Sequence, residues 1–387
     1  MEIRSASKQV FSKNLYISIH RKVEFGIVTD TSAENSGLHS IRSRFLHVLH
    51  SIRVHFVRVL QSPMTRYITR RLLYLIPLFF GILILVFVAS RLAGDPVKLM
   101  TGLNPRIKPD AIEALKRYYG LDQPLYYQFF KYLWDLLQGD LGNSYALRGG
   151  TPVTTLIGNY AWETFKLQLA ALFFSLLIAI PVGVTSARRQ YSKLDVSVTT
   201  ISLLGTCIPV FYIGIVGILV FSYFLGWFPP FGAHTLLAER YLFGNYTLDE
   251  LWHLALPTAI LTFAELAPIV LLVRSSMLEI LRQDYILAAR AGGLSERAVI
   301  YKHALRNALI PVVTYVGLFF GGMLAGAPIT ETVFNWPGVG RLYVEATSKL
   351  DFPLIMGITV FITLMTLFAN LITDITYAYI DPRIRIE

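Results

Sequence analysis

Apolar residues gather into about six long runs separated by polar and charged stretches. Each run has the length of about 20 largely apolar residues that a helix needs to cross the hydrocarbon core of a bilayer. Strands of a transmembrane barrel are shorter and alternate in polarity. The pattern therefore predicts an all-α membrane protein with about six transmembrane helices, near 70–92, 162–187, 197–226, 255–273, 308–330 and 355–379.

Basic residues beside these runs predict the orientation of the chain. Arginine and lysine are enriched in cytoplasmic loops, and all the basic groups fall on one side if six runs cross the membrane in order. Both termini are then cytoplasmic, as is the polar segment 284–311. The residues are Arg66, Arg70 and Arg71, then Arg188, Arg189 and Lys193, then Arg274, Arg282, Arg290, Arg297, Lys302 and Arg306, and finally Arg383 and Arg385.

The segment 284–311 lies between two apolar runs but is short, basic and helix-like. Its first part is rich in helix formers, and Gly292 and Gly293 are expected to end that helix, because glycine reaches positive φ without steric cost. Ser295 suits the N-cap of a second helix, and Glu296 suits its first turn. Such a helix–turn–helix is either a projection that another protein grips or simply a cytoplasmic loop that is basic for topology.

Two further parts flank the first run. The external stretch 94–160 is expected to form a small helical cap, with helices at 109–119 and 124–137. The basic extension 1–63 precedes the first span and has no obvious cleavage site, so it is not expected to be a secretory signal. It is either an amphipathic helix (41–60) on an anionic membrane face or a dispensable extension. One face of the second cap helix carries Tyr127, Phe130, Trp134 and Leu137.

The composition supports the membrane assignment and narrows the chemistry. Charged residues make up 16% of the chain, against about 25% in a soluble protein. The net charge of +10 arises from residues beside the apolar runs, so no nucleic-acid partner is expected. Cys207 is the single cysteine, and His234 and His253 are isolated, so no metal or cofactor is expected. The phosphate-binding GxxxxGK[ST] loop, HExxH and GxSxG are absent, so an energy source must come from another chain or an ion gradient.

Two features inside the spans are candidate functional positions. Glu265 stands in the fourth run, where an ionisable group is costly and marks a functional hypothesis. It either meets a substrate amine or metal ion, or is hydrogen-bonded to a neighbouring helix. The fifth run has glycines at a spacing of four, which let another helix approach closely. These glycines either pack within the chain or form a wall that moves during transport: Gly317, Gly321, Gly322 and Gly326.

Several short motifs follow one another along the chain. They are Gly94-Asp95-Pro96-Val97, Leu121-Asp122-Gln123-Pro124-Leu125, Gly139-Asp140-Leu141-Gly142, Arg274-Ser275-Ser276-Met277-Leu278-Glu279, Glu331-Thr332-Val333-Phe334 with Trp336-Pro337-Gly338, and Asp381-Pro382-Arg383-Ile384-Arg385. In this order and spacing, from about Met64 to Arg385, the chain resembles the inner-membrane permease subunits of bacterial and archaeal ABC importers of the dipeptide/oligopeptide/nickel class.

The resemblance implies that 284–311 contains the EAA-type loop of that family, whose coupling helix docks in a cleft of an ATPase subunit. Ala288, Ala289 and Gly293 fall on the A, A and G of the motif, while Leu287 stands where the broad motif has Glu. The implied coupling residues are Asp284, Ala288, Ala289, Gly292, Gly293, Ser295 and Glu296.

The resemblance also implies a type I ABC importer permease fold in the cell inner (plasma) membrane. The implied divisions are the extension 1–63, a first transmembrane helix 64–93, the cap 94–160 and a permease core 161–387 with its coupling loop near 279–306. The implied partners are a second homologous permease, two ATP-binding subunits, an external substrate-binding protein and membrane lipid. The chain itself would not be an enzyme. Peptides are the implied cargo, with nickel or another small solute as the alternative.

Two other classes remain open on the residues alone. A secondary transporter driven by an ion gradient would explain Glu265 and the prolines within the spans, and it would transport without other chains. A membrane scaffold would use the cap and the extension for protein contacts, and ATP depletion would not affect uptake. Neighbouring coding sequences with GxxxxGK[ST] loops would favour the ABC permease.

Overall fold

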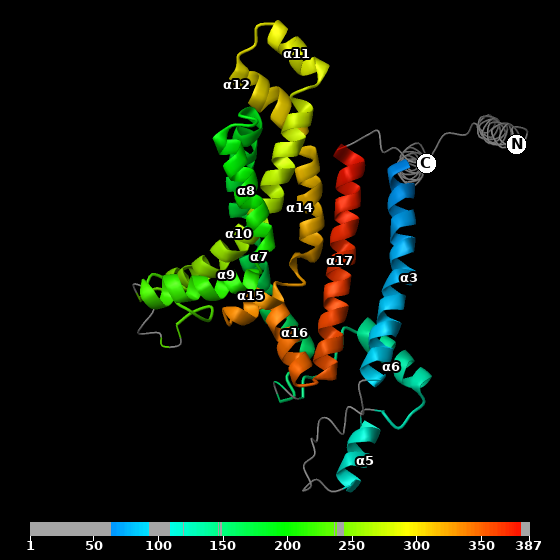
Figure 1. The fold of residues 1–387 in the computed structure, drawn as a ribbon. Helices are drawn as coiled ribbons and strands as arrows, with labels where there is room; N and C mark the ends of the chain where they lie inside the picture. The colour runs from blue at the N-terminus through cyan, green and yellow to red at the C-terminus, as the bar shows by residue number, and fades with distance from the viewer. Residues whose placement is uncertain are drawn as a thin grey trace, which may run out of the picture. The chain divides into compact units, whose positions relative to one another are not determined.

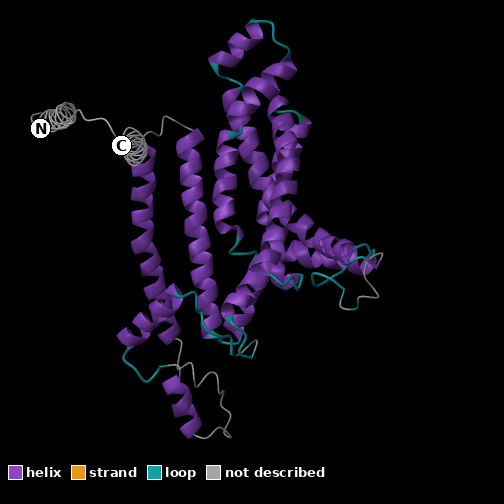
Figure 2. Cartoon of the chain, turned by 180° about the vertical axis from the view of Figure 1, so that it is seen from behind, coloured by secondary structure: helices purple, strands orange, loops and turns teal. Residues whose placement is uncertain are grey.

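The computed structural model describes residues 63–92, 109–118, 120–145, 147, 149–235, 237 and 244–380. The extension 1–62 and the motifs Gly94–Val97 and Asp381–Arg385 lie outside the described residues. Contacts divide the chain into the units Met1–Arg66 and Tyr67–Glu387, and the second holds nearly all of what is described. Regular structure in this described part is helical, apart from an isolated bridge between Asn143 and Pro152 (Figures 1 and 2), which confirms the all-α prediction.

Four helices are long and apolar enough to cross a membrane. They correspond to the first, second, fourth and sixth predicted runs. Three of these helices continue through internal prolines: the first through Pro77, the second through Pro181 and the third through Pro257 and Pro268. The helices are α3 (Pro63–Leu92), α7 (Val153–Arg188), α10 (Tyr246–Ile280) and α17 (Phe352–Ile380).

The third predicted run is not a straight helix. α8 (Lys193–Cys207) meets the following pair, α9 (Val210–Gly217) and the π-helix η1 (Ile218–Phe224), at an angle of 97°. Pro209 lacks an amide hydrogen and disfavours the helical conformation at the preceding residue. Ile208 is accordingly extended, with φ −86° and ψ 125°.

The fifth predicted run is also interrupted. A first segment is built from α12 (Glu296–Ala298), the π-helix η4 (Val299–Ala304) and α13 (Leu305–Ala308). It bends by 42° into α14 (Ile310–Met323), which has proline in its first turn. The six predicted runs therefore correspond to four continuous helices and two bent pairs, and the structure holds six spans if each bent pair counts as one.

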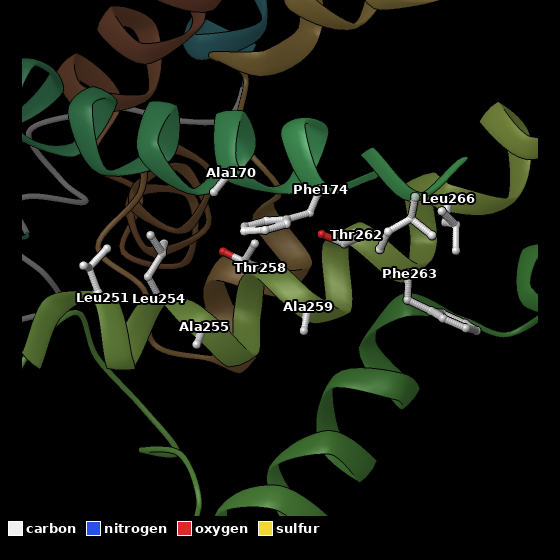
Figure 3. Close-up of a pocket in the computed structure, with 11 residues that line it drawn as sticks. Ala170, Phe174, Leu251, Leu254, Ala255, Thr258, Ala259, Thr262, Phe263 and Leu266 are labelled. Atoms are coloured by element: carbon white, nitrogen blue, oxygen red, sulfur yellow. The ribbon is translucent and has the colours of Figure 1, made fainter. Parts of the chain in front are cut away.

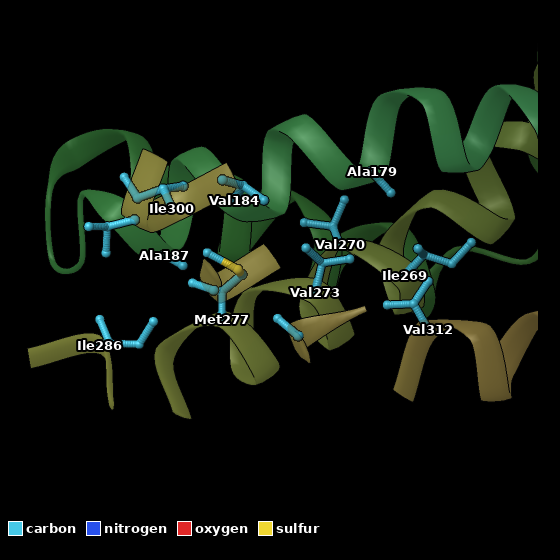
Figure 4. Packing of buried hydrophobic residues seen from close by; sticks show 13 residues of the cluster. Ala179, Val184, Ala187, Ile269, Val270, Val273, Met277, Ile286, Ile300 and Val312 are labelled. Atoms are coloured by element: carbon cyan, nitrogen blue, oxygen red, sulfur yellow. The ribbon is translucent and has the colours of Figure 1, made fainter. Parts of the chain in front are cut away.

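The core lies between α7 and α10, which make the most extensive helix contact of the described part. Figure 4 shows Ala179, Val184 and Ala187 of α7 facing Val270 and Met277 of α10, all buried. A side chain in place of the glycine at position 183 would meet Val273 Cγ1 at 2.8 Å, so the two helices approach closely there. α14 packs on α17, and α8 packs on α10.

The cap contains the two predicted helices, α5 (Pro109–Tyr118) and α6 (Leu125–Leu137). Gly120 has φ +64° and ends the first of them, as expected. Phe129 packs edge-on against Phe87 of α3, with ring centroids 5.2 Å apart. The aromatic face predicted on α6 is exposed, with Phe130 and Trp134 each more than 60% accessible.

Several of the described basic residues lie at one end of the second unit. Arg71 near the start of α3 lies 3.3 Å from Asp374 near the end of α17. Figure 1 shows that the end of α7, the start of α8 and the end of α10 lie together beneath α11 (Asp284–Ala291) and α12. At the other end of the bundle are α15 (Pro328–Val333), α16 (Val339–Ser348) and the start of α17.

Candidate functional site

The first candidate site is the loop of residues 284–296, formed by α11 and the turn that leads into α12. Its outer surface is exposed, and that surface includes apolar side chains, since Leu287 is 53% and Leu294 is 45% accessible. Among the coupling residues implied by the sequence, Ala289 is half-buried and the others are exposed, namely Asp284, Ala288, Gly292, Gly293, Ser295 and Glu296. This loop therefore presents a mixed apolar and charged surface.

Local sequence chemistry shapes the turn of the 284–296 loop. Gly293 has φ +79°, whereas Gly292 has φ −72°, so only the second glycine needs the left-handed conformation. Ser295 caps α12 as predicted, because its side chain accepts a hydrogen bond from the Ala298 amide at 3.4 Å. Arg290 donates two hydrogen bonds to the Glu296 carboxylate, at 2.9 and 3.2 Å. The Ser295 cap and the Arg290–Glu296 ion pair therefore both stabilise the turn between α11 and α12.

The inner surface of the same loop is anchored in the core. Ile286 is fully buried, and it is the buried residue of α11. It belongs to the cluster that contains Met277, Ala187, Val299 and Ile300 (Figure 4). The 284–296 loop is therefore fixed to the ends of α7 and α10, so a force applied to its outer surface acts on these long helices.

An ion pair lies at the base of this loop. Arg274 of α10 donates to both carboxylate oxygens of Asp195 in α8, at 2.5 and 2.8 Å. Asp195 is buried and also accepts from the Ser186 hydroxyl and the Tyr191 amide. The pair ties the turn between α7 and α8 to α10. Sequence reasoning singled out the motif at Arg274 but missed Asp195, because nothing local indicates a partner 79 positions away.

Glu265 makes a hydrogen bond within the bundle. The Tyr315 hydroxyl of α14 donates to Glu265 Oε2 at 2.9 Å, and both side chains are partly buried. This contact matches the second of the two interpretations of Glu265, a hydrogen bond to a neighbouring helix. It leaves the other carboxylate oxygen without a hydrogen bond to any described residue.

The four candidate glycines have different surroundings. A Cβ at Gly317 would meet Thr373 Cγ2 at 2.8 Å, and one at Gly321 would meet Asn370 Oδ1 at 3.0 Å, so these two pack against α17. Gly322 has no atom of another described helix or loop within 4 Å of its Cβ position. Gly326 has φ +82° and lies in a turn, where a Cβ would be 2.8 Å from the Gly340 nitrogen.

The turn at Gly326 belongs to a buried polar cluster, which we call the Glu331 hub. Glu331 Oε1 accepts from the Ala327 amide at 3.1 Å and from the Thr164 hydroxyl at 3.0 Å. Its Oε2 accepts from the Arg341 amide at 2.9 Å. Thr164 Oγ1 in turn accepts from the Val339 amide at 2.8 Å. One carboxylate thus joins α7, α15 and the start of α16.

Burial dominates the electrostatics of this hub. Glu331 is fully buried, and the loss of hydration raises the pKa of its carboxyl even though several donors favour the charged form. Trp336 is also fully buried and donates its indole hydrogen to the Glu163 carbonyl at 3.0 Å. The sequence motif around Glu331 is therefore a packing unit, which sequence reasoning used as a family mark without recognising the buried carboxylate.

An apolar groove of about 580 Å³ runs along α7 and α10. Figure 3 shows Phe174 of α7 above Thr258, Ala259 and Thr262 of α10. The Thr258 hydroxyl is buried without a hydrogen-bond partner in the described part of the chain. Sequence reasoning missed this groove, because its alanines, leucines and phenylalanines look like those of any membrane span. In the residues that the structure describes, no group of His, Cys, Asp and Glu could hold a metal ion.

Two family profiles match the chain. The profile described as "Binding-protein-dependent transport system inner membrane component" matches residues 179–386. The profile described as "Binding-prot-dependent transport system membrane comp, N-term" matches residues 64–152. The first match includes the 284–296 loop, Glu265 and most of the Glu331 hub.

Individual relatives are similar over most of their length. The chain is 44% identical to the "Oligopeptide transport system permease protein AppB" of Bacillus subtilis (strain 168), over 83% of this chain and 99% of that protein. It is 40% identical to the "Di/tripeptide transport system permease protein DppB" of Pseudomonas aeruginosa (strain UCBPP-PA14) and 36% identical to the "Dipeptide transport system permease protein DppB" of Escherichia coli (strain K12), with the same coverage. Among solved structures, a chain of the inward-facing MetNI methionine ABC transporter is 19% identical, with a TM-score of 0.43 over 57% of this chain and 95% of that one.

Proposed function

The chain belongs to the family of binding-protein-dependent transport system inner membrane components, and from this premise we propose that it forms part of a peptide pathway through the membrane. It is a multi-pass permease component of an ABC importer, a kind of subunit that has no catalytic activity of its own. Both statements agree with what the sequence motifs implied. The family works with ATPase and substrate-binding proteins, so the energy source lies on other chains.

Peptides are the proposed cargo, with dipeptides and oligopeptides as the class. The names of the three relatives support this assignment, because each of them names a peptide transport system and nearly the whole of each protein is matched. Nickel or another small solute remains the second candidate within the same class of importers. The permease has few groups that could select a cargo, so selection is assigned to the binding protein.

The 284–296 loop is proposed to couple ATP hydrolysis to transport. Its exposed outer surface, with Leu287 and Leu294, suits a cleft in a partner, while Ile286 anchors its inner surface in the core. The Arg274–Asp195 pair adds a stiff connection to α8. Movement of the loop by an ATPase would then move α7, α8 and α10 as packed elements, which is the kind of rigid-body switch that importers need.

The proposed assembly has one further permease of the same family, two ATP-binding subunits and an external substrate-binding protein that docks on the cap. The termini and the 284–296 loop are proposed to be cytoplasmic. The support is the positive-inside rule together with the location of Arg71, Arg188 and Arg274 at one end of the bundle. The division of the chain into extension, first helix, cap and core remains a prediction from the sequence.

Glu265 and Gly322 are proposed to face the pathway. Glu265 has one carboxylate oxygen without a hydrogen bond in the described part of the chain, and Gly322 has open space at its Cβ position. Gly317, Gly321 and Gly326 are assigned to packing within the chain, because a Cβ at each would collide with a neighbour. Unchanged uptake kinetics in Glu265→Gln would remove the substrate role of Glu265.

The assembly is tested by isolating the tagged chain from detergent-solubilised native membranes and identifying the proteins that accompany it by mass spectrometry. Recovery of a second permease and of ATPase subunits is expected. The chain recovered alone, with uptake that stops when the ion gradient is dissipated, would point to a secondary transporter instead. Comparing the uptake of labelled dipeptides and of nickel between cells with and without the gene then distinguishes the two kinds of cargo.

A further inference from the structure

A polar hollow lies next to the 284–296 loop, and none of its lining residues belongs to the residues proposed for coupling. A hollow there is lined by Arg188, Arg297 and Tyr301. Arg188 is the last residue of α7, and Arg297 is the second residue of the segment that bends into α14. Both helices belong to candidate membrane spans, so the hollow lies where these spans end.

The charges around the hollow are not balanced. Arg297 has no ion pair or hydrogen bond with any residue that the structure describes. The nearby carboxylate of Glu296 already accepts two hydrogen bonds from Arg290, and Arg188 is close enough to add an electrostatic interaction. Among the described residues, the lining of the hollow contains two guanidinium groups and no carboxylate, so its charge is positive.

The side chains are of the kind that bind a phosphate at a membrane surface. Guanidinium groups form bidentate hydrogen bonds with phosphate oxygens, and the phenol of Tyr301 is a further donor. Tyrosine also prefers the level of the lipid headgroups, and Tyr301 is 49% accessible. Basic pockets between membrane helices on the cytoplasmic side are suited to anionic headgroups.

We propose that the hollow formed by Arg188, Arg297 and Tyr301 binds the phosphate of an anionic phospholipid. The location favours a lipid over an acidic side chain of an ATPase. Figure 1 shows α11 at the outer end of the loop and α12 between it and the start of α8, so a partner that grips α11 contacts the chain farther out. A bound lipid would fix the end of α7 to the start of the segment that leads into α14.

The test measures lipid retention by the intact complex, transferred to nanodiscs of phosphatidylcholine with increasing phosphatidylglycerol and examined by native mass spectrometry. In the double variant Arg188→Gln/Arg297→Gln, the apparent affinity for phosphatidylglycerol should fall about 30-fold, since two basic contacts are lost. The matched control is Arg189→Gln/Lys193→Gln, which removes the same charge from exposed positions beside the hollow. It should retain lipid like the unmodified complex.

Equal retention in the double variant and the unmodified complex would overturn the proposal, as would equal losses in the two double variants. The variant Arg188→Lys/Arg297→Lys keeps the charge, and an affinity between those of the Gln variant and the unmodified complex is expected from a phosphate that needs bidentate contacts. Displacement of the lipid by millimolar inorganic phosphate would assign the hollow to a soluble phosphate instead. Loss of ATPase subunits from the Gln variant with unchanged lipid retention would assign it to a protein partner.

Discussion

Gly293 in the 284–296 loop and Gly326 in the Glu331 hub have nearly the same backbone conformation, with φ +79° and +82°. Their surroundings are opposite. In the described part of the chain, apart from the adjacent residues, no atom lies within 4 Å of the Cβ position at Gly293, whereas at Gly326 the Gly340 nitrogen and Glu331 Oε1 each lie at 2.8 Å. Positive φ alone therefore identifies a turn, and only the neighbours decide whether the turn serves folding or contact with a partner.

The two regions are held together in different ways. In the Glu331 hub, buried donors converge on one carboxylate, so substitutions should act on stability. In the 284–296 loop, the polar contacts are exposed and Ile286 is the one fully buried residue of α11, so substitutions on the outer surface should act on partner binding. Substitutions at five positions test this contrast.

Glu331→Ala should have the largest effect on stability. It leaves the Ala327 and Arg341 amides and the Thr164 hydroxyl without their acceptor in a buried site. Each unsatisfied donor costs about 1–3 kcal/mol, so a total loss of about 3–5 kcal/mol in the free energy of unfolding is expected. Denaturation of the purified complex in mixed micelles measures it, and a loss below about 1 kcal/mol would contradict the hub.

Glu331→Gln is the companion variant, because glutamine keeps the shape of the glutamate side chain and one of its two acceptor oxygens. Burial raises the pKa of the Glu331 carboxyl, so the folded chain keeps this proton at pH values where the unfolded chain has released it. The free energy of unfolding should therefore fall as the pH rises between the ordinary and the raised pKa. The Gln variant should lose less stability than Ala and should lack this part of the pH dependence.

Gly326→Ala should have the second largest effect. The left-handed conformation costs an alanine about 1–2 kcal/mol, and the collision with the Gly340 backbone adds an overpacking cost of about 1–3 kcal/mol. We expect a loss of about 3 kcal/mol in the free energy of unfolding, measured as for Glu331→Ala. If Gly326→Ala had the same free energy of unfolding as the unmodified chain, the turn would be able to relax and accommodate the added Cβ.

Gly293→Ala should cost only the conformational term, about 1 kcal/mol, because its Cβ position is open. Gly293→Val, with a β-branched side chain, should leave the bundle folded but reduce recovery of ATPase subunits with the tagged chain. Normal assembly and full uptake in the valine variant would exclude the coupling role of this turn.

Leu287→Ser should have the smallest effect on stability, within about 0.5 kcal/mol, because Leu287 is exposed. Its expected effect is on binding, measured as the amount of ATPase subunit that accompanies the purified chain. Ile286→Ser is the matched control, since the adjacent residue is fully buried and should lower stability instead. Equal ATPase recovery in Leu287→Ser and the unmodified chain would show that this surface is not the contact.

Local features were predictable because they depend on residues close together in the sequence. Length and hydropathy located the four long membrane helices, and the capping preference of Ser295 and the conformational freedom of Gly293 located the ends of the loop helices. Proline was predictable only as a possible break. Pro181 lies in a continuous helix, while Pro209 accompanies a bend of 97°.

The amino-acid sequence by itself determined the membrane class, the helical periodicity, the basic end of the bundle and the order of family motifs. Tertiary structure decided which polar groups meet: Asp195 with Arg274, Glu265 with Tyr315, and Glu331 with two amides and the Thr164 hydroxyl. It also decided which glycines are packed and which are open. The physical reason is range, since capping, turns and hydrophobic spacing act over a few residues, whereas a buried polar group is satisfied by whichever distant segment folding brings within about 3 Å.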